Sequence, residues 1–380
     1  MHIATRDVSV TAPGFVAQAE ALAGQFAERA AVHDRDGSFV AENYAALKAA
    51  GFFAAAVPSE LGGGGADLAE VSEIIRTLAH GCSSTALAYA MHSHQVVIPA
   101  WRWHNQAPAK AAVEPLLKRI AAEGLILTSS GGGDWVGGSG RAEKVDGGWK
   151  VHAKKGFVSG SPVGDLLMTG VVSEEGVLHF ALPLRADGVR RVNDWDTMGM
   201  RGTGSERVEI DGYFLADEKV ALKRNAGEWH MIFYITGTLA IPLIYSAYVG
   251  VAERARDRAV GLAKARSGAA RQPALAGDME TELRAAQMAL AHMIRSAETM
   301  APGPDSVNEV MIGRQLVERH AIKAVELAME LASGSGFYRA AGVEQAFRDI
   351  QAARYHPMRR DRQSLFAGSL ALGDSVAEIF

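Results

Sequence analysis

Only one cysteine, Cys82, occurs among the 380 residues of the sequence. A single thiol excludes a disulfide framework and a cysteine-based metal cluster, and it fits a reducing compartment. Histidine, aspartate and glutamate also lack the spacing of a metal site, so no metal is expected. Cys82 has no strongly cationic or helix N-terminal context that would favour a nucleophile, and we interpret it as a small buried residue.

An excess of one charge is also missing, because 39 lysines and arginines stand against 43 acidic residues, a formal net charge of -4. This balance gives no reason to expect nucleic acid or a membrane surface as a partner. The first ten residues have no apolar stretch typical of a signal peptide. The longest apolar run, residues 232–251, is interrupted by Thr236, Thr238, Pro242 and Ser246, which favours a buried helix over a membrane span. We therefore expect a soluble protein of the cytoplasm.

Helical spacing dominates the first third of the sequence. Apolar residues recur at helical intervals between residues 13 and 31, and another helix is expected over residues 84–97. Asp67 followed by Glu70 predicts a capping box at the start of a further helix. These patterns predict an N-terminal helical domain over residues 1–123.

Strand-like runs begin near Leu125. They are residues 125–128, 149–152, 166–172, 178–182 and 207–210. Turn signals separate them, notably Asp146-Gly147-Gly148 and Asp211-Gly212. Because no long crossover helix lies between the runs, we predict an antiparallel β domain over residues 124–228.

The helical period returns near Trp229 and predicts a C-terminal helical bundle over residues 229–380. The expected fold is therefore mainly α, with a β domain between two helical parts. Two apolar faces in the bundle predict a homo-oligomer, a tetramer or at least a dimer. These faces comprise Leu283, Met288, Leu290 and Met293, and Leu316, Val325, Leu327 and Leu331.

Six segments in chain order resemble those of the acyl-CoA dehydrogenase superfamily, and the resemblance covers nearly the whole chain. They are residues 57–63 (VPSELGG), 84–88 (STALA), 128–134 (TSSGGGD), 156–160 (GFVSG), 199–205 (GMRGTGS), and 334–337 (GSGF) followed by Val343-Glu344 and Arg348-Asp349. The resemblance implies a flavin-dependent oxidoreductase. Its cofactor would be FAD, or alternatively FMN supplied in the reduced state by a partner reductase.

The resemblance also implies which residues hold the flavin. The segment that ends with Thr128, Ser129 and Ser130 would offer backbone N–H groups and a hydroxyl to the polar edge of the ring. Phe157 would stack beside the ring, and Ser159 would reach its reactive edge. Two glycines, Gly334 and Gly336, would let the backbone approach the diphosphate of the cofactor closely. Each segment alone is also typical of an ordinary turn, and their joint occurrence in the family order favours the flavin site.

The sequence departs from a dehydrogenase at the catalytic base. In common dehydrogenases of the superfamily, a glutamate shortly after the Arg-Asp pair removes the α proton. Alignment on Arg348-Asp349 places Pro357 at that position, with His356 just before it. The alternative base position of some members, on the long helix after the β domain, falls at or near Ile241. Neither proline nor isoleucine accepts a proton, so no base for α,β-dehydrogenation is found.

Residues 348–356 resemble another branch of the superfamily, the two-component flavin monooxygenases, which receive reduced flavin from a reductase. In that branch, His356 and Ser159 would hydrogen-bond oxygen at the reactive edge of the flavin. His92, on the helix expected to line the substrate cavity, is the third catalytic candidate and is favoured over His94. The structural alternative for His356 is a helix C-terminal residue that complements the helix dipole before Pro357.

Three functions remain open at this point. The favoured one is a monooxygenase that acts on a small molecule such as an aromatic compound. The second is an acyl-CoA dehydrogenase with a displaced base, for which an electron-transfer flavoprotein would be the partner. The third is a non-catalytic binding protein on a flavin fold, which the missing glutamate favours and the retained flavin-edge residues oppose.

Overall fold

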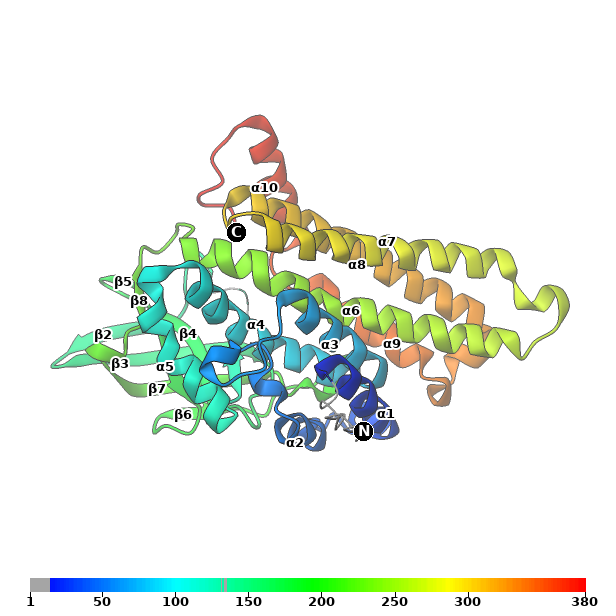
Figure 1. Cartoon of the computed structure of the whole chain (residues 1–380), viewed down its shortest axis with the longest axis horizontal. Coiled ribbons are helices and arrows are strands. Elements are labelled where there is room, and N and C mark those ends of the chain that lie inside the picture. The colour runs from blue at the N-terminus through cyan, green and yellow to red at the C-terminus, as the bar shows by residue number, and fades with distance from the viewer. Residues whose placement is uncertain (1–13, 131, 133–134) are drawn as a thin grey trace, which may run out of the picture.

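A computed structural model describes residues 14–130, 132 and 135–380. Helices occupy both ends of the chain and a β sheet the middle, as predicted (Figure 1). The predicted flavin-edge segment falls partly outside the described residues, at Gly131, Gly133 and Asp134. Helices end at Glu123 and resume at Met231, close to the predicted limits of the β domain.

The N-terminal part consists of α1 (Phe15–Asp36), α2 (Ala41–Ala49), α3 (Leu68–Gly81), α4 (Ser83–Asn105) and α5 (Ala107–Glu123), with short 3-10 turns η1 (Phe52–Ala54) and η2 (Ser59–Leu61). The carboxylate of Asp67 accepts a hydrogen bond of 2.8 Å from the backbone N–H of Glu70, which confirms the predicted cap of α3. Helix α4 runs eight residues beyond its predicted end and passes through Pro99. Its buried residues around Pro99 stabilise the helix where the proline alone would disfavour it.

The middle part is an eight-stranded sheet in the order β6-β7-β3-β2-β4-β5-β8, with β1 beside β4. Its strands are β1 (Leu127–Ser129), β2 (Arg141–Val145), β3 (Gly148–Val158), β4 (Leu166–Ser173), β5 (Gly176–Pro183), β6 (Val189–Arg191), β7 (Glu206–Ala216) and β8 (Leu222–Arg224). Most neighbours are antiparallel, but β1 pairs with β4 in parallel, and Arg141 of β2 pairs in parallel with Val172. The prediction of a wholly antiparallel sheet is wrong for these two pairs. The β2–β3 hairpin lies between β1 and β4 in the sequence, and this intervening segment allows β4 to run in the same direction as β1.

One of the two predicted turns is confirmed and the other is wrong. Asp146 and Gly147 connect β2 and β3, with Gly147 at a φ of 72°. Asp211 and Gly212 lie inside β7, at a β-bulge where the register against β3 shifts between Val151 and His152. The extra residue of a bulge interrupts the alternation of a strand, and Gly212 takes a φ of 75°, so the sequence has the pattern of a turn.

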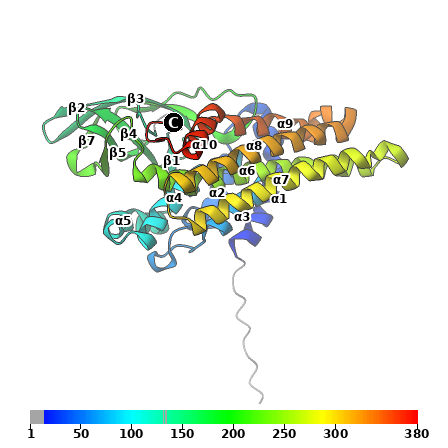
Figure 2. The same ribbon diagram turned by 90° about the horizontal axis from the view of Figure 1, so that it is seen from above.

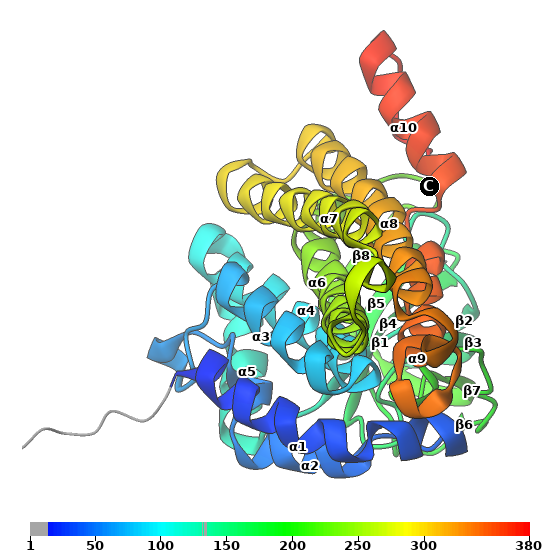
Figure 3. The same ribbon diagram turned by 90° about the vertical axis from the view of Figure 1, so that its right-hand side faces the viewer.

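The C-terminal part contains α6 (Met231–Lys264), α7 (Pro273–Thr299), α8 (Pro304–Ala332), α9 (Val343–Ile350) and α10 (Arg360–Leu372), and the 3-10 turns η7 (Ser333–Phe337), η8 (Arg339–Ala341) and η9 (Gln351–Tyr355). Figure 3 shows α6 enclosed by neighbouring helices. Within the described residues, α6 alone is long and apolar enough to cross a membrane, but 83% of its most apolar stretch is buried inside the protein. It is a core helix, as predicted from the polar residues that interrupt it.

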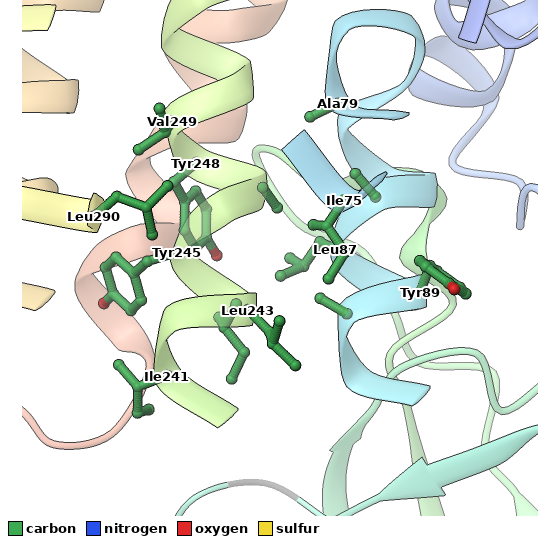
Figure 4. Packing of buried hydrophobic residues seen from close by; sticks show 14 of the residues in the cluster. Ile75, Ala79, Leu87, Tyr89, Ile241, Leu243, Tyr245, Tyr248, Val249 and Leu290 are labelled. Carbon is green, nitrogen blue, oxygen red and sulfur yellow. The ribbon is translucent and has the colours of Figure 1, made fainter. Parts of the chain in front are cut away.

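Two apolar cores lie side by side. The larger one joins α3 and α4 to α6 and α8, and Figure 4 shows part of it, with Ile75, Leu87, Leu243 and Tyr248 among the packed side chains. The smaller one lies against the sheet around the fully buried Trp149. The candidate site lies where the end of β3, the loop after β1 and the segment after α9 meet the larger core.

Candidate functional site

The end of β3 exposes one aromatic ring and buries one hydroxyl. Phe157 has a φ of 56°, which is rare for a residue other than glycine, and its side chain is 68% exposed. Its ring contacts Trp195 edge to face, with the centroids 6.0 Å apart. Ser159 is buried two residues later. An exposed apolar ring beside a buried polar group suits a planar ligand that has a polar edge.

Ser159 begins a chain of buried hydroxyl groups. Its Oγ lies 2.8 Å from the Oγ of Ser205, which lies 2.7 Å from the Oγ1 of Thr203. Thr203 donates to the carbonyl oxygen of Met200 at 2.9 Å. Because the proton of Thr203 points to that carbonyl, Thr203 accepts from Ser205, and Ser205 accepts from Ser159. The lone pairs of Ser159 therefore remain available to a donor on a ligand.

Helix α9 supports this chain of hydroxyl groups through a contact with Met200. The backbone N–H of Met200 donates to Oδ1 of Asp349 at 2.6 Å, and a Cβ added to Gly199 would lie only 2.3 Å from the carbonyl oxygen of Arg348. Asp349 is buried, and its Oδ2 has no hydrogen-bond partner among the described residues. Burial raises the pKa of the Asp349 carboxyl to about 6. The position of Ser159 thus depends on a contact between the β domain and the C-terminal helices.

His356 follows η9 in extended backbone and is partly buried. Its Nε2 lies 2.5 Å from the hydroxyl oxygen of Tyr248 on α6. Its carbonyl oxygen accepts a hydrogen bond of 2.9 Å from Arg314 of α8, whose guanidinium also pairs with Glu318 at 2.6 Å. Burial, followed by the nearby Arg314 and His94, lowers the pKa of His356 to about 3. The imidazole is therefore neutral at physiological pH.

The loop after β1 lies against the segment that carries His356. A Cβ added to Gly132 would lie 2.3 Å from Cγ of Pro357, so only a glycine fits there without movement of the proline. This contact brings the sheet edge near Ser130 next to the C-terminal segment, although the two are more than 200 residues apart in the sequence. The structure therefore brings the loop after Ser130 to the segment of His356, and the hydroxyl chain links Ser159 to Asp349, seven residues before His356.

His92 does not have a free ring nitrogen in this structure. Its Nε2 lies 2.8 Å from the carbonyl oxygen of Phe53, and its Nδ1 accepts from the backbone N–H of Leu127 at 3.0 Å. Burial lowers the pKa of His92 to about 4, so the ring is neutral and connects α4 to β1. This arrangement argues against the catalytic part predicted for His92 and indicates a structural one.

His94, the less favoured neighbour, lies close enough to His356 to contribute to the lowered pKa of His356. Its two ring nitrogens also have protein partners. Nδ1 lies 3.0 Å from the carbonyl oxygen of Ala90, and Nε2 lies 2.8 Å from the side-chain amide of Gln95. Of the three histidines, only His356 keeps a nitrogen, Nδ1, without a partner among the described residues.

The two hydroxyl residues at the end of β1 differ. Thr128 is fully buried and donates to the carbonyl oxygen of Leu166 at 3.1 Å, so its hydroxyl serves the sheet and is not offered to a ligand. Ser130 is partly buried, 3.1 Å from the hydroxyl of Thr169. The predicted contribution of a hydroxyl to the flavin edge therefore rests on Ser130 rather than Thr128.

The glycines predicted to approach a diphosphate lie in another part of the structure. Gly334 and Gly336 belong to η7, in the turn between α8 and α9, at the end of the bundle away from the sheet (Figures 1 and 2). Gly334 is exposed, with no atom within 4 Å of an added Cβ, whereas Gly336 packs closely on Ala332. A single chain therefore does not bring these glycines to Phe157 and Ser159.

Sequence reasoning missed three residues of the site. Ser205 lies in a segment that was matched to the superfamily, and the serine and threonine beside its glycines were the available signal. Tyr248 lies in the longest apolar run, where a tyrosine is typical of a core position. Arg314 is fully buried in α8, and an arginine in an amphipathic helix gives no sign that its side chain points inward.

Comparison with known proteins places these features in a wider group. The model of the acyl-CoA dehydrogenase N-terminal domain matches residues 15–119, and that of the C-terminal domain matches residues 243–360, which together exceed half of the chain. A Bacillus subtilis protein named "Putative acyl-CoA dehydrogenase YdbM" is 28% identical over 90% of this chain and 92% of its own. The L-evernosamine nitrososynthase of a Micromonospora species is 26% identical over 86% of this chain and 82% of its own.

A solved structure with the same fold is that of the dibenzothiophene monooxygenase TdsC from Paenibacillus sp. A11-2. It superposes with a TM-score of 0.82 at 18% identity, over 94% of this chain and 97% of TdsC. TdsC has also been solved with FMN and indole.

Proposed function

Because this chain belongs to the acyl-CoA dehydrogenase family of flavin-dependent oxidoreductases, we propose that it is a monooxygenase that uses reduced flavin and molecular oxygen. The observation that carries the proposal is the pair of Tyr248 and His356 next to the position where dehydrogenases of the family hold a carboxylate. Tyr248, Arg314 and His94 act on His356, and none of the three is a carboxylate. An imidazole whose pKa is lowered to about 3 is a poor base for an α proton, but it can hydrogen-bond oxygen.

The residues at the end of β3 fit a flavin. The exposed ring of Phe157 would cover one face of the isoalloxazine, and Ser159 would accept a hydrogen bond at the reactive edge. The direction of the hydroxyl chain adds a preference, because N5 of a reduced flavin bears a hydrogen and N5 of an oxidised flavin does not. A bound reduced flavin would supply the two electrons that oxygen activation needs.

The proposal also covers the cofactor, the class of substrate, the source of reduced flavin and the cellular location. FMN is favoured over FAD because the structurally similar TdsC binds FMN, and its second ligand, indole, supports a small aromatic substrate. A flavin reductase would supply the reduced cofactor. We place the protein in the cytoplasm, where one buried cysteine is compatible with reducing conditions.

A homotetramer is the proposed assembly. The two apolar faces from which the sequence predicts it do not support a subunit contact, because most of their residues are buried within one subunit, namely Leu283, Leu290, Met293, Val325, Leu327 and Leu331. The side chains of Phe337 and Tyr338 are 83% and 73% exposed at the far end of the bundle. Large apolar side chains exposed together are typical of a subunit contact. A second copy would also be needed to bring Gly334 and Gly336 to the flavin.

The test separates the proposed reaction from dehydrogenation. Flavin-loaded protein is mixed anaerobically with saturated acyl-CoA thioesters of several chain lengths, and separately with an NADH-driven flavin reductase, 18O2 and indole. We expect no flavin bleaching by any thioester, and 18O in the indole product. Rapid bleaching by one thioester, with no label in indole, would overturn the proposal in favour of dehydrogenation.

A further inference from the structure

Tyr248 is the direct neighbour of His356, and the proposed function does not specify what its hydroxyl does. Its side chain leaves the middle of α6 one turn after Tyr245, and both rings are buried (Figure 4). The hydroxyl oxygen lies 2.5 Å from Nε2 of His356, and the two ring centroids are 5.5 Å apart. Nε2 is therefore committed to Tyr248, and Nδ1 is the nitrogen left for a ligand.

Both members of this pair are neutral at physiological pH. Burial raises the pKa of the Tyr248 phenol well above its usual value of 10, with a further contribution from Tyr245. Burial and the positive charge of Arg314 lower the pKa of His356. The pair consequently holds two protons, one on the phenol and one on the imidazole. Only the position of the imidazole proton is left to decide.

Hydrogen bonding determines which ring nitrogen of His356 carries this proton. Among the described residues, the Tyr248 hydroxyl has no acceptor other than Nε2 of His356. If Nε2 carried the proton, the buried phenolic hydrogen would have no acceptor, which is unfavourable. If Tyr248 donates to Nε2, the phenolic hydrogen and Nε2 are both satisfied, and the imidazole proton resides on Nδ1, the nitrogen without a partner among the described residues. Tyr245 differs in this respect, because its hydroxyl donates to the carbonyl oxygen of Ala353 at 2.6 Å.

Among the described residues, no other neighbour competes for Nε2 of His356. Arg314, from α8, binds the backbone carbonyl of His356 and only donates. His94, from α4, directs its two nitrogens at Ala90 and Gln95. Of the groups that face the imidazole from α4, α6 and α8, only Tyr248 contacts a ring nitrogen.

We propose that Tyr248 is a positioning residue that fixes His356 in the tautomer with the proton on Nδ1, so that His356 is a hydrogen-bond donor toward the ligand. A base would need the opposite arrangement, with a bare Nδ1. Donation stops short of proton transfer, because loss of the Nδ1 proton with transfer of the Tyr248 proton to Nε2 would leave a buried phenolate. The inference rests on the proposed function only for the identity of the acceptor, an oxygen atom of bound oxygen or of substrate.

The experiment measures the tautomer directly. Full-length protein with 15N-labelled histidine is compared in the wild type, Tyr248→Phe and Tyr245→Phe, and the His356 signals are assigned with His356→Gln. In the wild type we expect a protonated Nδ1 and an unprotonated Nε2, in roughly ten-fold excess or more over the other tautomer. Tyr248→Phe removes the donor and should lower this excess at least several-fold. Tyr245→Phe loses a buried hydroxyl on the same helix and should leave the excess unchanged.

An unprotonated Nδ1 in the wild type would overturn the inference, even if Tyr248→Phe did not fold. An unchanged tautomer ratio in folded Tyr248→Phe would overturn it as well. The spectra need no turnover, so they are independent of the proposed function. The expected tautomer in a protein that oxygenates nothing would contradict the proposed function alone, whereas the opposite tautomer in an active monooxygenase would contradict this inference alone.

Discussion

The backbone N–H of Met200 donates a hydrogen bond of 2.6 Å to Asp349, and this contact helps to join the β domain to the C-terminal helices beside the candidate site. Met200 in turn accepts from Thr203, the last hydroxyl of the chain that starts at Ser159. Asp349 is seven residues before His356 in the sequence. The same helix end thus supports the serine on one side of the site and leads to the histidine on the other.

Asp349 should make stability depend on pH. Its pKa is raised from 3.8 to about 6 by burial. Between about pH 4 and pH 6 the unfolded chain loses this proton while the folded protein retains it, so the free energy of unfolding falls as the pH rises. Asp349→Asn keeps an acceptor for Met200 but cannot ionise. Urea unfolding of both proteins across this range should show a fall on the order of 2–3 kcal/mol in the wild type relative to the variant. Parallel pH profiles would contradict the assignment.

His92→Ala should reduce stability more than it alters the site. It leaves the N–H of Leu127 and the carbonyl oxygen of Phe53 without their partner, at a cost of roughly 2–4 kcal/mol in the free energy of unfolding. His104→Ala, at an exposed position of the same helix, is the control and should change little. Urea denaturation gives the stabilities, and flavin titration of the folded fraction should show unchanged affinity. A stable variant with lost flavin affinity would restore His92 to the site.

Ser205→Ala should change the preference of the site for the redox state of the flavin. Without Ser205, the hydroxyl of Ser159 is free to donate, and the acceptor for a reduced N5–H is no longer fixed. The affinity for reduced flavin relative to oxidised flavin should fall by about 1 kcal/mol, which corresponds to roughly 20 mV in the two-electron potential. Ser161→Ala is the matched control. The buried hydroxyl of Ser161 donates to the carbonyl oxygen of Gly204 and does not belong to the chain of hydroxyl groups that starts at Ser159. An equal shift in both variants would argue against a directional hydroxyl chain.

Phe337→Glu should weaken the proposed homotetramer. A carboxylate in place of an 83% exposed apolar ring costs little in a monomer but is unfavourable in a buried subunit contact. Light scattering at micromolar concentration should show a tetramer, or at least a dimer, for the wild type and a smaller species for the variant. Val145→Glu, at an exposed position at the end of the β2–β3 hairpin, is the control and should retain the assembly. A monomeric wild type would remove the proposal.

The sequence was sufficient for the order of helices and strands, because that order depends on periodicity along the chain. Asp67 with Glu70 and the interrupted apolar run of α6 are local patterns with one favoured structure each. The sequence predicts a turn at Gly212, where the structure has a bulge. An inserted residue in a strand and a tight turn both favour a glycine of positive φ, so the two cannot be distinguished locally. Which strands pair in parallel depends on contacts between β1 and β4, and no local pattern records them.

The site could be predicted only where its residues lie in recognisable segments. The resemblance identifies Ser159, Phe157 and His356 in this way, and their part in a flavin site stays a prediction. The partners that determine their protonation, Tyr248 and Ser205, are hydroxyl residues at buried positions, and their roles depend on the direction of hydrogen bonds in three dimensions. The sequence favours His92 over His94, and only the structure shows that both ring nitrogens of each histidine have protein partners.

We propose that this protein binds reduced flavin for reaction with oxygen and that His356 donates a hydrogen bond in that reaction. The most direct measurement is stopped-flow mixing of the FMN-reduced wild type and His356→Ala with oxygenated buffer, followed by flavin absorbance and by the yield of hydrogen peroxide. We predict slower flavin reoxidation in the wild type than for free reduced FMN. His356→Ala should reoxidise roughly ten-fold faster and release more peroxide, since one hydrogen bond contributes about 0.5–1.5 kcal/mol. Identical reoxidation rates and peroxide yields in the two proteins and in free FMN would contradict the claim.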